Sequence, residues 1–138
     1  YDRAIDLSAR NDLTMRALNN SGVICFESGR PAEARRYFQQ ALAKNADRVL
    51  TAEAFTNLGI LEAASGNFAQ AEEHLQQALT LNPDDAHSHF YLGRVLLGMG
   101  QKSAAEQSLY TAAKLDPQFQ AAVQSLLATP GEPAKTAD

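Results

Sequence analysis

The same small and apolar residue types recur at an interval of 34 residues in the second half of this chain. Seven positions match at this offset: Leu58 and Leu92, Gly59 and Gly93, Gly66 and Gly100, Ala71 and Ala105, Leu75 and Leu109, Ala78 and Ala112, Pro83 and Pro117. Five more residues precede their counterparts by 37 positions: Gly22, Gly29, Ala34, Phe38 and Ala41. Such a period is typical of elongated proteins in which each unit packs only on its neighbours.

These positions resemble the tetratricopeptide repeat family, whose 34-residue unit carries Leu-Gly in its first half, Ala at two later positions and Pro near its end. The resemblance covers residues 1–128. It implies an all-α fold, a right-handed α-solenoid of stacked antiparallel helix pairs. It also implies that the chain binds other proteins through positions that differ between members.

The resemblance divides the chain into six segments. We expect residues 1–9 to be the tail helix of a truncated preceding repeat, and 120–128 to be a C-terminal capping helix. Residues 15–48, 52–85 and 86–119 are the three expected repeats, and 129–138 a flexible tail. Three repeats reach the usual minimum for a stable stack.

Glycine and proline mark the expected helix ends. Gly29 should end a helix that begins near Leu13, after capping side chains at Asn11 and Asp12, and Pro31 suits the first turn of the next helix. The remaining helices are expected at 31–44, 50–65, 68–81, 85–99 and 102–115. The three extra residues of the first repeat predict a longer or irregular turn at 45–49.

Composition excludes several classes of function. Twelve Lys and Arg against sixteen Asp and Glu give a net charge of −4, so we expect no attraction to nucleic acid. One cysteine excludes an internal disulfide and a cysteine-based zinc site. No apolar run is long enough to span a membrane, which predicts no direct membrane insertion in this segment.

The chain opens at Tyr1 without a methionine, and we therefore interpret it as a fragment of a longer protein. The compartment is not determined by the sequence. We expect a periplasmic or outer-membrane-associated location if the chain is part of a pilus-assembly lipoprotein, and a cytoplasmic location otherwise.

One stripe of the first helix of each repeat should be polar if it met only water, but it carries aromatic and apolar side chains. In the family this stripe lines a concave groove, so it is the candidate peptide-binding site. We assign to it Arg16, Asn19, Asn20, Phe26, Asn57, Ile60, His87, Phe90, Tyr91 and Arg94. Exposed aromatic residues beside Asn and Arg are typical of protein-binding surfaces.

Each residue type of the stripe has a predicted role. Asn20 and Asn57 share one repeat position and can each bond an extended backbone through a donor and an acceptor. Tyr91 and the phenylalanines would take apolar side chains, and Arg94 an acidic group. The alternative is that residues such as Phe26 and Leu97 pack against a neighbouring helix.

Residues with catalytic or metal-binding side chains form no functional pattern. His87 and His89 are two positions apart and point to different sides of a helix, and His89 takes a core position. Cys25 is predicted to be a small buried hydrophobe. We therefore expect no cofactor, no metal site and no enzymatic activity. Only Asn57 matches the clamp with which some family members hold a chaperone's C-terminal carboxylate, so such a clamp is not expected.

The predicted function is a protein–protein interaction scaffold that binds a peptide or helix of a partner in the groove. The segments Leu18–Gly22 and Glu27–Arg30 are also similar to bacterial outer-membrane lipoproteins that assist assembly of the type IV pilus secretin. Two alternatives stay open. One is a non-catalytic repeat arm of a larger enzyme or regulator, such as a glycosyltransferase. The other is self-association through exposed end helices.

Overall fold

The computed structural model describes residues 2–44 and 47–128. Within these residues the chain is helical and has no strand, as the repeat resemblance predicted. The elements are α1 (Asp2–Glu27), α2 (Pro31–Leu42), α3 (Arg48–Ala64), α4 (Phe68–Leu81), α5 (Ala86–Gly98), α6 (Lys102–Leu115), the 3-10 helix η1 (Pro117–Phe119) and α7 (Gln120–Leu127). The expected tail at 129–138 and the centre of the expected irregular turn, Asn45 and Ala46, lie outside the described residues.

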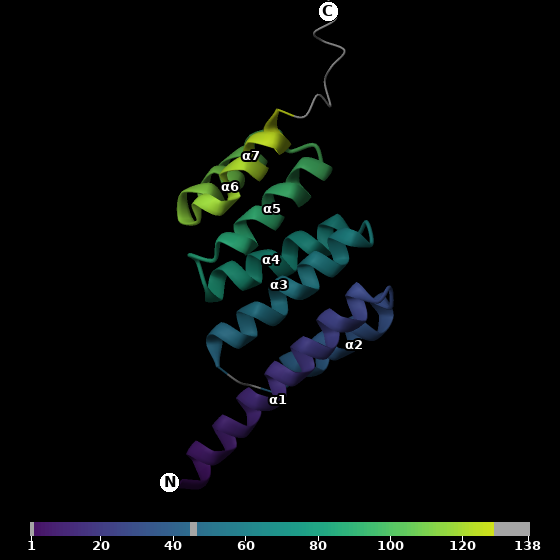
Figure 1. Cartoon of the computed structure of the whole chain (residues 1–138), viewed down its shortest axis with the longest axis vertical. Coiled ribbons are helices and arrows are strands. Elements are labelled where there is room, and N and C mark those ends of the chain that lie inside the picture. The colour runs from purple at the N-terminus through teal and green to yellow at the C-terminus, as the bar shows by residue number, and fades with distance from the viewer. Residues whose placement is uncertain (1, 45–46, 129–138) are drawn as a thin grey trace, which may run out of the picture.

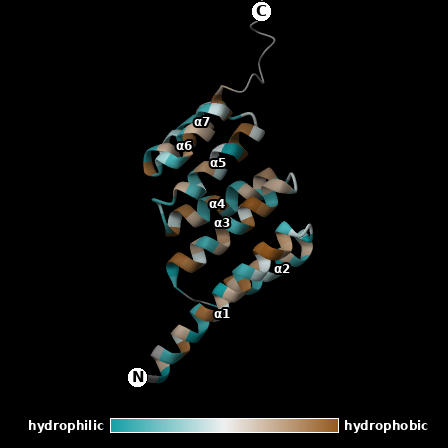
Figure 2. Ribbon diagram, in the orientation of Figure 1, coloured by the Kyte–Doolittle hydropathy of each residue, from teal (hydrophilic) through white to brown (hydrophobic). Residues whose placement is uncertain are grey.

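The helices form three hairpins stacked along one axis: α1 with α2, α3 with α4, and α5 with α6 (Figure 1). Each helix packs on the next one in the chain, α1 also touches α3, and α3 also touches α5. Each hairpin therefore meets only its neighbours, which is the arrangement of an α-solenoid. Apolar and polar residues alternate along the helices, so that one face of each helix can be buried in the stack (Figure 2).

The first helix differs from the expected two segments. α1 runs without a break over 26 residues, so the predicted tail at 1–9 and the predicted helix from Leu13 are one element. No glycine or proline lies between Asp2 and Ser21 to stop it, and Thr14 donates its hydroxyl to the Arg10 carbonyl within the helix. Asp12, expected to cap this helix, instead accepts a hydrogen bond from the Asp47 N–H at 3.0 Å. Residues 6–10 of α1 are exposed, and this end projects from the stack (Figure 1).

The turns inside the hairpins follow the predicted glycines. Gly66 has a φ of 83°, a left-handed conformation that costs glycine little. Its N–H bonds to the Ala63 carbonyl at 3.1 Å, and the N–H of Asn67 bonds to the Glu62 carbonyl at 2.8 Å. This pattern satisfies the last carbonyls of α3. Gly29 and Gly100 repeat the same conformation at the ends of α1 and α5.

A second set of glycines allows the two helices of each hairpin to pack closely. A Cβ atom added to Gly59 would lie 2.6 Å from Cγ of Leu75, and one added to Gly93 would lie 2.5 Å from Cγ of Leu109. In the first hairpin a Cβ on Gly22 would lie 2.4 Å from the Phe38 ring. The large residue of each second helix thus fills the space that the glycine leaves, as the repeat pattern predicted.

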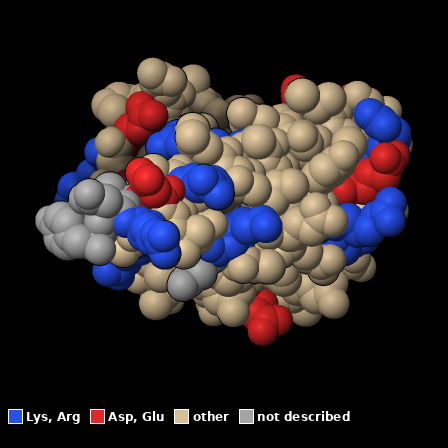
Figure 3. All heavy atoms as spheres, turned by 90° about the horizontal axis from the view of Figure 1, so that it is seen from below, with Lys and Arg blue, Asp and Glu red and all other residues tan. Residues whose placement is uncertain are grey.

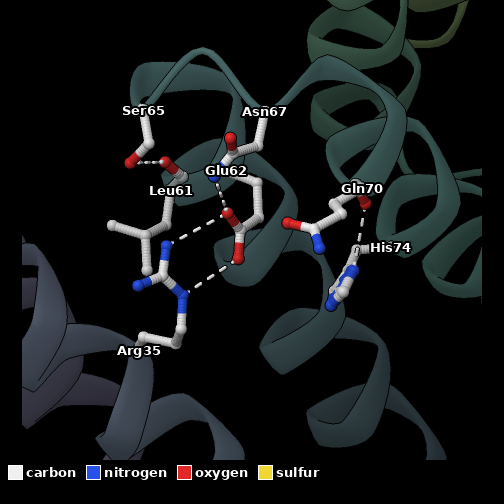
Figure 4. Close-up of polar contacts among 7 residues, drawn as sticks. All are labelled: Arg35, Leu61, Glu62, Ser65, Asn67, Gln70 and His74. Atoms are coloured by element: carbon white, nitrogen blue, oxygen red, sulfur yellow. Dashed lines mark hydrogen bonds and ion pairs between the residues drawn. The ribbon is translucent and has the colours of Figure 1, made fainter.

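Neighbouring hairpins are joined by a partly buried ion pair (Figure 4). Arg35 of α2 donates two hydrogen bonds of 3.0 Å to the carboxylate of Glu62 in α3, whose side chain is only 6% exposed. Asn67 donates a third at 2.8 Å. Burial acts to raise the pKa of Glu62, but the hydrogen bonds from Arg35 and Asn67 outweigh it and hold the pKa below its ordinary value. A charge buried in this way is strongly destabilising if its partner is removed.

The last hairpin is covered by η1 and α7, close to the expected capping helix. Val123 is 1% exposed and packs with Leu109 and Ala112 of α6, and Leu126 lies against the same cluster. Gln120 and Gln124 face solvent, as expected for a helix that ends a stack.

Candidate functional site

The first helices of the hairpins, α1, α3 and α5, supply most of the walls of two neighbouring pockets. The first pocket, of about 310 Å³, lies between the start of α3 and the start of α5. Its walls are Val49, Ala52, Glu53, Thr56, Asn57, Ile60, Asn82, Asp85 and His87. It combines apolar side chains with two carboxylates, and no lysine or arginine is among these lining residues.

The polar wall of the first pocket is held by hydrogen bonds between α3 and α5. The hydroxyls of Thr56 and Ser88, both buried, lie 2.7 Å apart, and Ser88 donates to the Asp85 carboxylate at 2.6 Å. On the other side, Asn19 of α1 donates to Glu53 at 3.5 Å. Neutral donors therefore orient both carboxylates without cancelling their charge.

The second pocket, of about 460 Å³, is lined by Phe26, Ile60, Ala63, Ala64, Phe68, Tyr91, Arg94 and Val95. Most of these side chains are apolar, and Ile60 belongs to both pockets. The guanidinium carbon of Arg94 lies 5.5 Å from the centre of the Tyr91 ring and 6.0 Å from that of Phe90. These cation–π contacts hold an exposed positive charge at the edge of an apolar hollow. We call the two pockets together the groove.

The structure brings six of the ten predicted site residues into the groove. Asn57 and His87 line the first pocket, Phe26, Tyr91 and Arg94 the second, and Ile60 both. Phe26 also packs against the core cluster around Cys25, so the groove assignment and the packing alternative both apply to it. Arg16 and Asn20 are exposed on α1 but line neither pocket.

Asn19 and Phe90 are buried rather than exposed. Asn19 is 1% exposed and donates a hydrogen bond to Glu53 of the next hairpin, while its Oδ1 has no hydrogen-bond partner among the described residues. Phe90 is 8% exposed and stacks on Phe119, with ring centres 4.8 Å apart. The previous repeat has Asp85 in the place of Phe119, so the repeat pattern contained no sign that this position of α5 would be covered.

Ten lining residues of the groove were not among the predicted site residues, and three of them show why the prediction missed them. Val49 was expected in the irregular turn, but α3 already begins at Arg48, and Val49 lines the first pocket from the first turn of this helix. Phe68 lines the second pocket from the start of α4. Glu53 lies four and seven positions before Asn57 and Ile60, on the same face of α3, but was not assigned to the site. A search limited to one helix face could not find Val49 or Phe68, because neither lies on the stripe.

A tetratricopeptide repeat profile matches residues 13–84, and a second profile with the same description matches residues 62–129. The chain belongs to the tetratricopeptide repeat family. The tetratricopeptide repeat (TPR) resemblance of the sequence is therefore confirmed, and the three hairpins are TPR helix pairs.

Solved TPR-like structures share the fold. An O-GlcNAc transferase mutant of Thermobaculum terrenum is 30% identical, with a TM-score of 0.77 over 86% of this chain and 22% of that one. The Yersinia enterocolitica secretion chaperone SycD with a YopD peptide is 23% identical, with a TM-score of 0.73 over 83% and 89% of the two chains. The second TPR of Spaghetti (RPAP3) bound to an HSP90 peptide is 17% identical, with a TM-score of 0.76 over 84% and 97%.

The present chain thus spans about a fifth of the transferase, whereas it spans most of the SycD and RPAP3 structures. Among curated proteins, none matches the chain significantly.

The described TPR residues show no group of three or more His, Cys, Asp or Glu side chains placed to hold a metal ion. Cys25 is 5% exposed, which confirms the prediction of a small buried side chain. His89 is half-buried, and its Nε2 lies 2.8 Å from the Pro83 carbonyl, where it closes the turn between α4 and α5.

None of the described helices is both long enough and apolar enough to cross a membrane. The N-terminal end of the TPR stack shows more basic than acidic side chains, with both signs interspersed among uncharged residues (Figure 3). The excess of basic residues in this part of the chain is small, eight against six over residues 1–51. The absence of nucleic-acid binding stays a prediction, as does self-association.

Proposed function

We propose that this chain is a protein-interaction module whose groove binds a peptide or helix of a partner protein. The observation that supports it is the pair of adjacent pockets, which are lined mainly from α3 and α5 and share Ile60 as a wall. Their walls combine aromatic and aliphatic side chains with a few fixed polar groups, the composition of a recognition surface. The TPR structures of RPAP3 and SycD described above hold peptides of HSP90 and YopD.

The ten predicted site residues divide into three groups under this proposal. Those that line the pockets would contact the partner directly. Arg16 and Asn20, exposed on α1, would contact a partner that extends beyond the pockets. Asn19 and Phe90 would act indirectly, since Asn19 bonds to Glu53, and Phe90 packs edge-on against Tyr91 at 5.5 Å.

The proposal is tested by affinity capture with matched tyrosine variants. Tyr91→Ala removes an aromatic wall of the second pocket, whereas Tyr110→Ala removes a side chain that is 59% exposed on α6 and lines neither pocket. Partners captured from a lysate of the source organism should be lost with Tyr91→Ala and kept with Tyr110→Ala. Asn57→Ala and Arg94→Glu should reduce capture as well. Equal capture by the wild type and all three groove variants would place the binding surface elsewhere.

A second candidate is a non-catalytic TPR arm of a larger enzyme. The 30% identity to the Thermobaculum terrenum O-GlcNAc transferase, of which this chain spans 22%, supports this alternative. The sequence of the gene on both sides of the segment distinguishes the two candidates, because a neighbouring catalytic domain would make the groove part of an enzyme.

A role in assembly of a bacterial envelope or pilus machine is the most specific form of the proposal. It has only the sequence segments around Asn19 and Gly29 in its favour, and none of the comparisons reported above supports it. A lipid-attachment cysteine encoded upstream would favour it. A gene without one, or with a catalytic domain, would contradict it.

A further inference from the structure

The two pockets of the groove differ in charge. The first pocket carries the carboxylates of Glu53 and Asp85, and neither is in an ion pair with another described residue. Its apolar walls, Val49 and Ile60 among them, suit the methylene stem of a lysine or arginine, while the carboxylates suit the charged end.

The second pocket has the opposite sign. Arg94 is exposed, and its guanidinium has cation–π contacts but no ion pair with a carboxylate among the described residues. The rest of the lining is largely aliphatic or aromatic, including Phe26 and Phe68. This hollow suits an apolar side chain whose neighbour in the ligand is acidic.

The distance between the pockets restricts the ligand. His87 lines the first pocket and Arg94 the second, seven residues further along α5, which is about 10 Å of helix. In a polyproline II conformation, residues three apart lie on one side of the chain and about 9 Å apart. Adjacent pockets of this spacing therefore fit side chains at positions i and i+3 of an extended peptide.

We infer, on the basis of the proposed function, that the groove binds an extended peptide of defined charge pattern. A lysine or arginine of the peptide occupies the acidic first pocket, an apolar side chain three residues away occupies the second, and an acidic residue next to it pairs with Arg94. Charge complementarity at both ends fixes the direction in which the peptide lies.

A random nonapeptide display library selected on the immobilised full chain tests this pattern. Selection should enrich a basic residue three positions from Leu, Ile, Met or Phe, with Asp or Glu beside the apolar residue. Selection on the Tyr91→Ala variant should not enrich it. Fluorescence anisotropy then measures binding of Ala-Lys-Ala-Ala-Leu-Glu-Ala and of the same peptide in reversed order, one of which should bind more tightly.

Charge reversal supplies the decisive measurement. Glu53→Lys should lower the affinity for the preferred peptide at least about tenfold. Replacing the peptide lysine by glutamate should restore much of that affinity. Arg94→Glu should likewise lower the affinity for this peptide, and replacing the peptide glutamate by lysine should restore much of it. Glu73→Lys and Arg36→Glu make the same charge changes at exposed positions that line neither pocket, and each should change affinity by less than about twofold.

Each other outcome contradicts a defined part of the account. An enriched peptide with a different pattern that requires Tyr91 would overturn the charge pattern and leave groove binding in place. Selection of no peptide that requires Tyr91 would overturn the extended-peptide ligand, and groove binding itself would be overturned if the groove variants also captured partners as well as the wild type does. A dimer in light scattering that Tyr91→Ala abolishes would show that a second copy of the chain, and not a peptide, occupies the groove.

Discussion

At the scale of single residues, Gly59 sets how closely α3 and α4 pack. Its hydrogen atom faces Leu75, which is fully buried, and the Ala71 carbonyl also lies within 3.3 Å of where a Cβ would be. The backbone carbonyl cannot move without disturbing α4. A methyl group at position 59 must therefore displace Leu75 or separate the helices.

Gly59→Ala should lower the free energy of unfolding by about 1–3 kcal/mol, because overpacking outweighs the gain in helix propensity of about 1 kcal/mol. Urea unfolding followed by circular dichroism measures this change. In a Leu75→Ala background the clash is removed, so the same substitution should be neutral or stabilising. A stabilising effect of Gly59→Ala in the wild-type background would show that the interface can adapt.

Glu62 and His74 make stability depend on pH in the same direction. The pKa of Glu62 lies below its ordinary value of 4.5. The contribution of its carboxylate to the free energy of unfolding is therefore complete above pH 4.5 and is lost as the pH falls through the lower folded-state pKa. Burial lowers the pKa of His74 below its ordinary value of 6.5, despite the nearby charges of Glu62 and Glu73. The unfolded chain then binds the proton more readily, so stability falls as the pH drops below 6.5.

The two residues act in separate pH ranges, so His74→Gln isolates one of them. Wild-type stability should decrease between about pH 7 and pH 5.5, and the His74→Gln variant should lose most of that dependence while still weakening below about pH 4.5. Denaturant unfolding at closely spaced pH values measures both slopes. If the free energy of unfolding of the variant changed with pH as steeply as that of the wild type between pH 7 and pH 5.5, groups other than His74 would cause this dependence.

At the scale of elements, helix ends were predictable wherever glycine or proline punctuates the chain. α4 and α6 have the expected bounds because Gly66, Gly100 and Pro83 leave little choice of conformation. The long α1 was missed because Asn11 and Asp12 resemble caps but do not prevent a helix from continuing.

The groove was predictable in part for a related reason. Asn57 and Tyr91 take the same position in consecutive repeats, 34 residues apart, and both line the groove, as periodicity predicts. Contacts from positions that differ between repeats follow from the tertiary structure alone. An example is the contact of Phe119 with Phe90, because the previous repeat has Asp85 in the place of Phe119.

The free end of α1 should be less stable than the part packed in the stack. Ala9 and Ala17 are both exposed alanines of the same helix, but only Ala17 lies beside the packed residues Met15 and Asn19. Ala17→Pro should cost about 3 kcal/mol, as proline does within a helix. Ala9→Pro should cost less than about 1 kcal/mol, because the turns before it can unfold alone. Urea unfolding compares the two, and equal losses would mean that the whole helix folds as one unit.

At the scale of the whole molecule, stability comes from a row of interfaces between neighbouring hairpins. The central hairpin, α3 with α4, has a hairpin on each side, whereas α5 with α6 is covered on its outer side only by η1 and α7. The groove lies on the seam between these two hairpins, so opening of the last hairpin would dismantle both pockets. Binding of a partner there should in turn stabilise that seam.

Leu75 and Leu109 occupy equivalent positions in these two hairpins, and both are fully buried. Replacing either with alanine should lower the local free energy of unfolding by about 2–5 kcal/mol. The two substitutions should, however, destabilise different parts of the stack. Leu109→Ala should let α5–α7 open first, so hydrogen exchange accelerates there and not in α1 and α2. Leu75→Ala weakens the hairpin between the other two, and exchange should accelerate along the whole stack. Equal acceleration of α1 and α2 in both variants would mean that the solenoid unfolds only as a single unit.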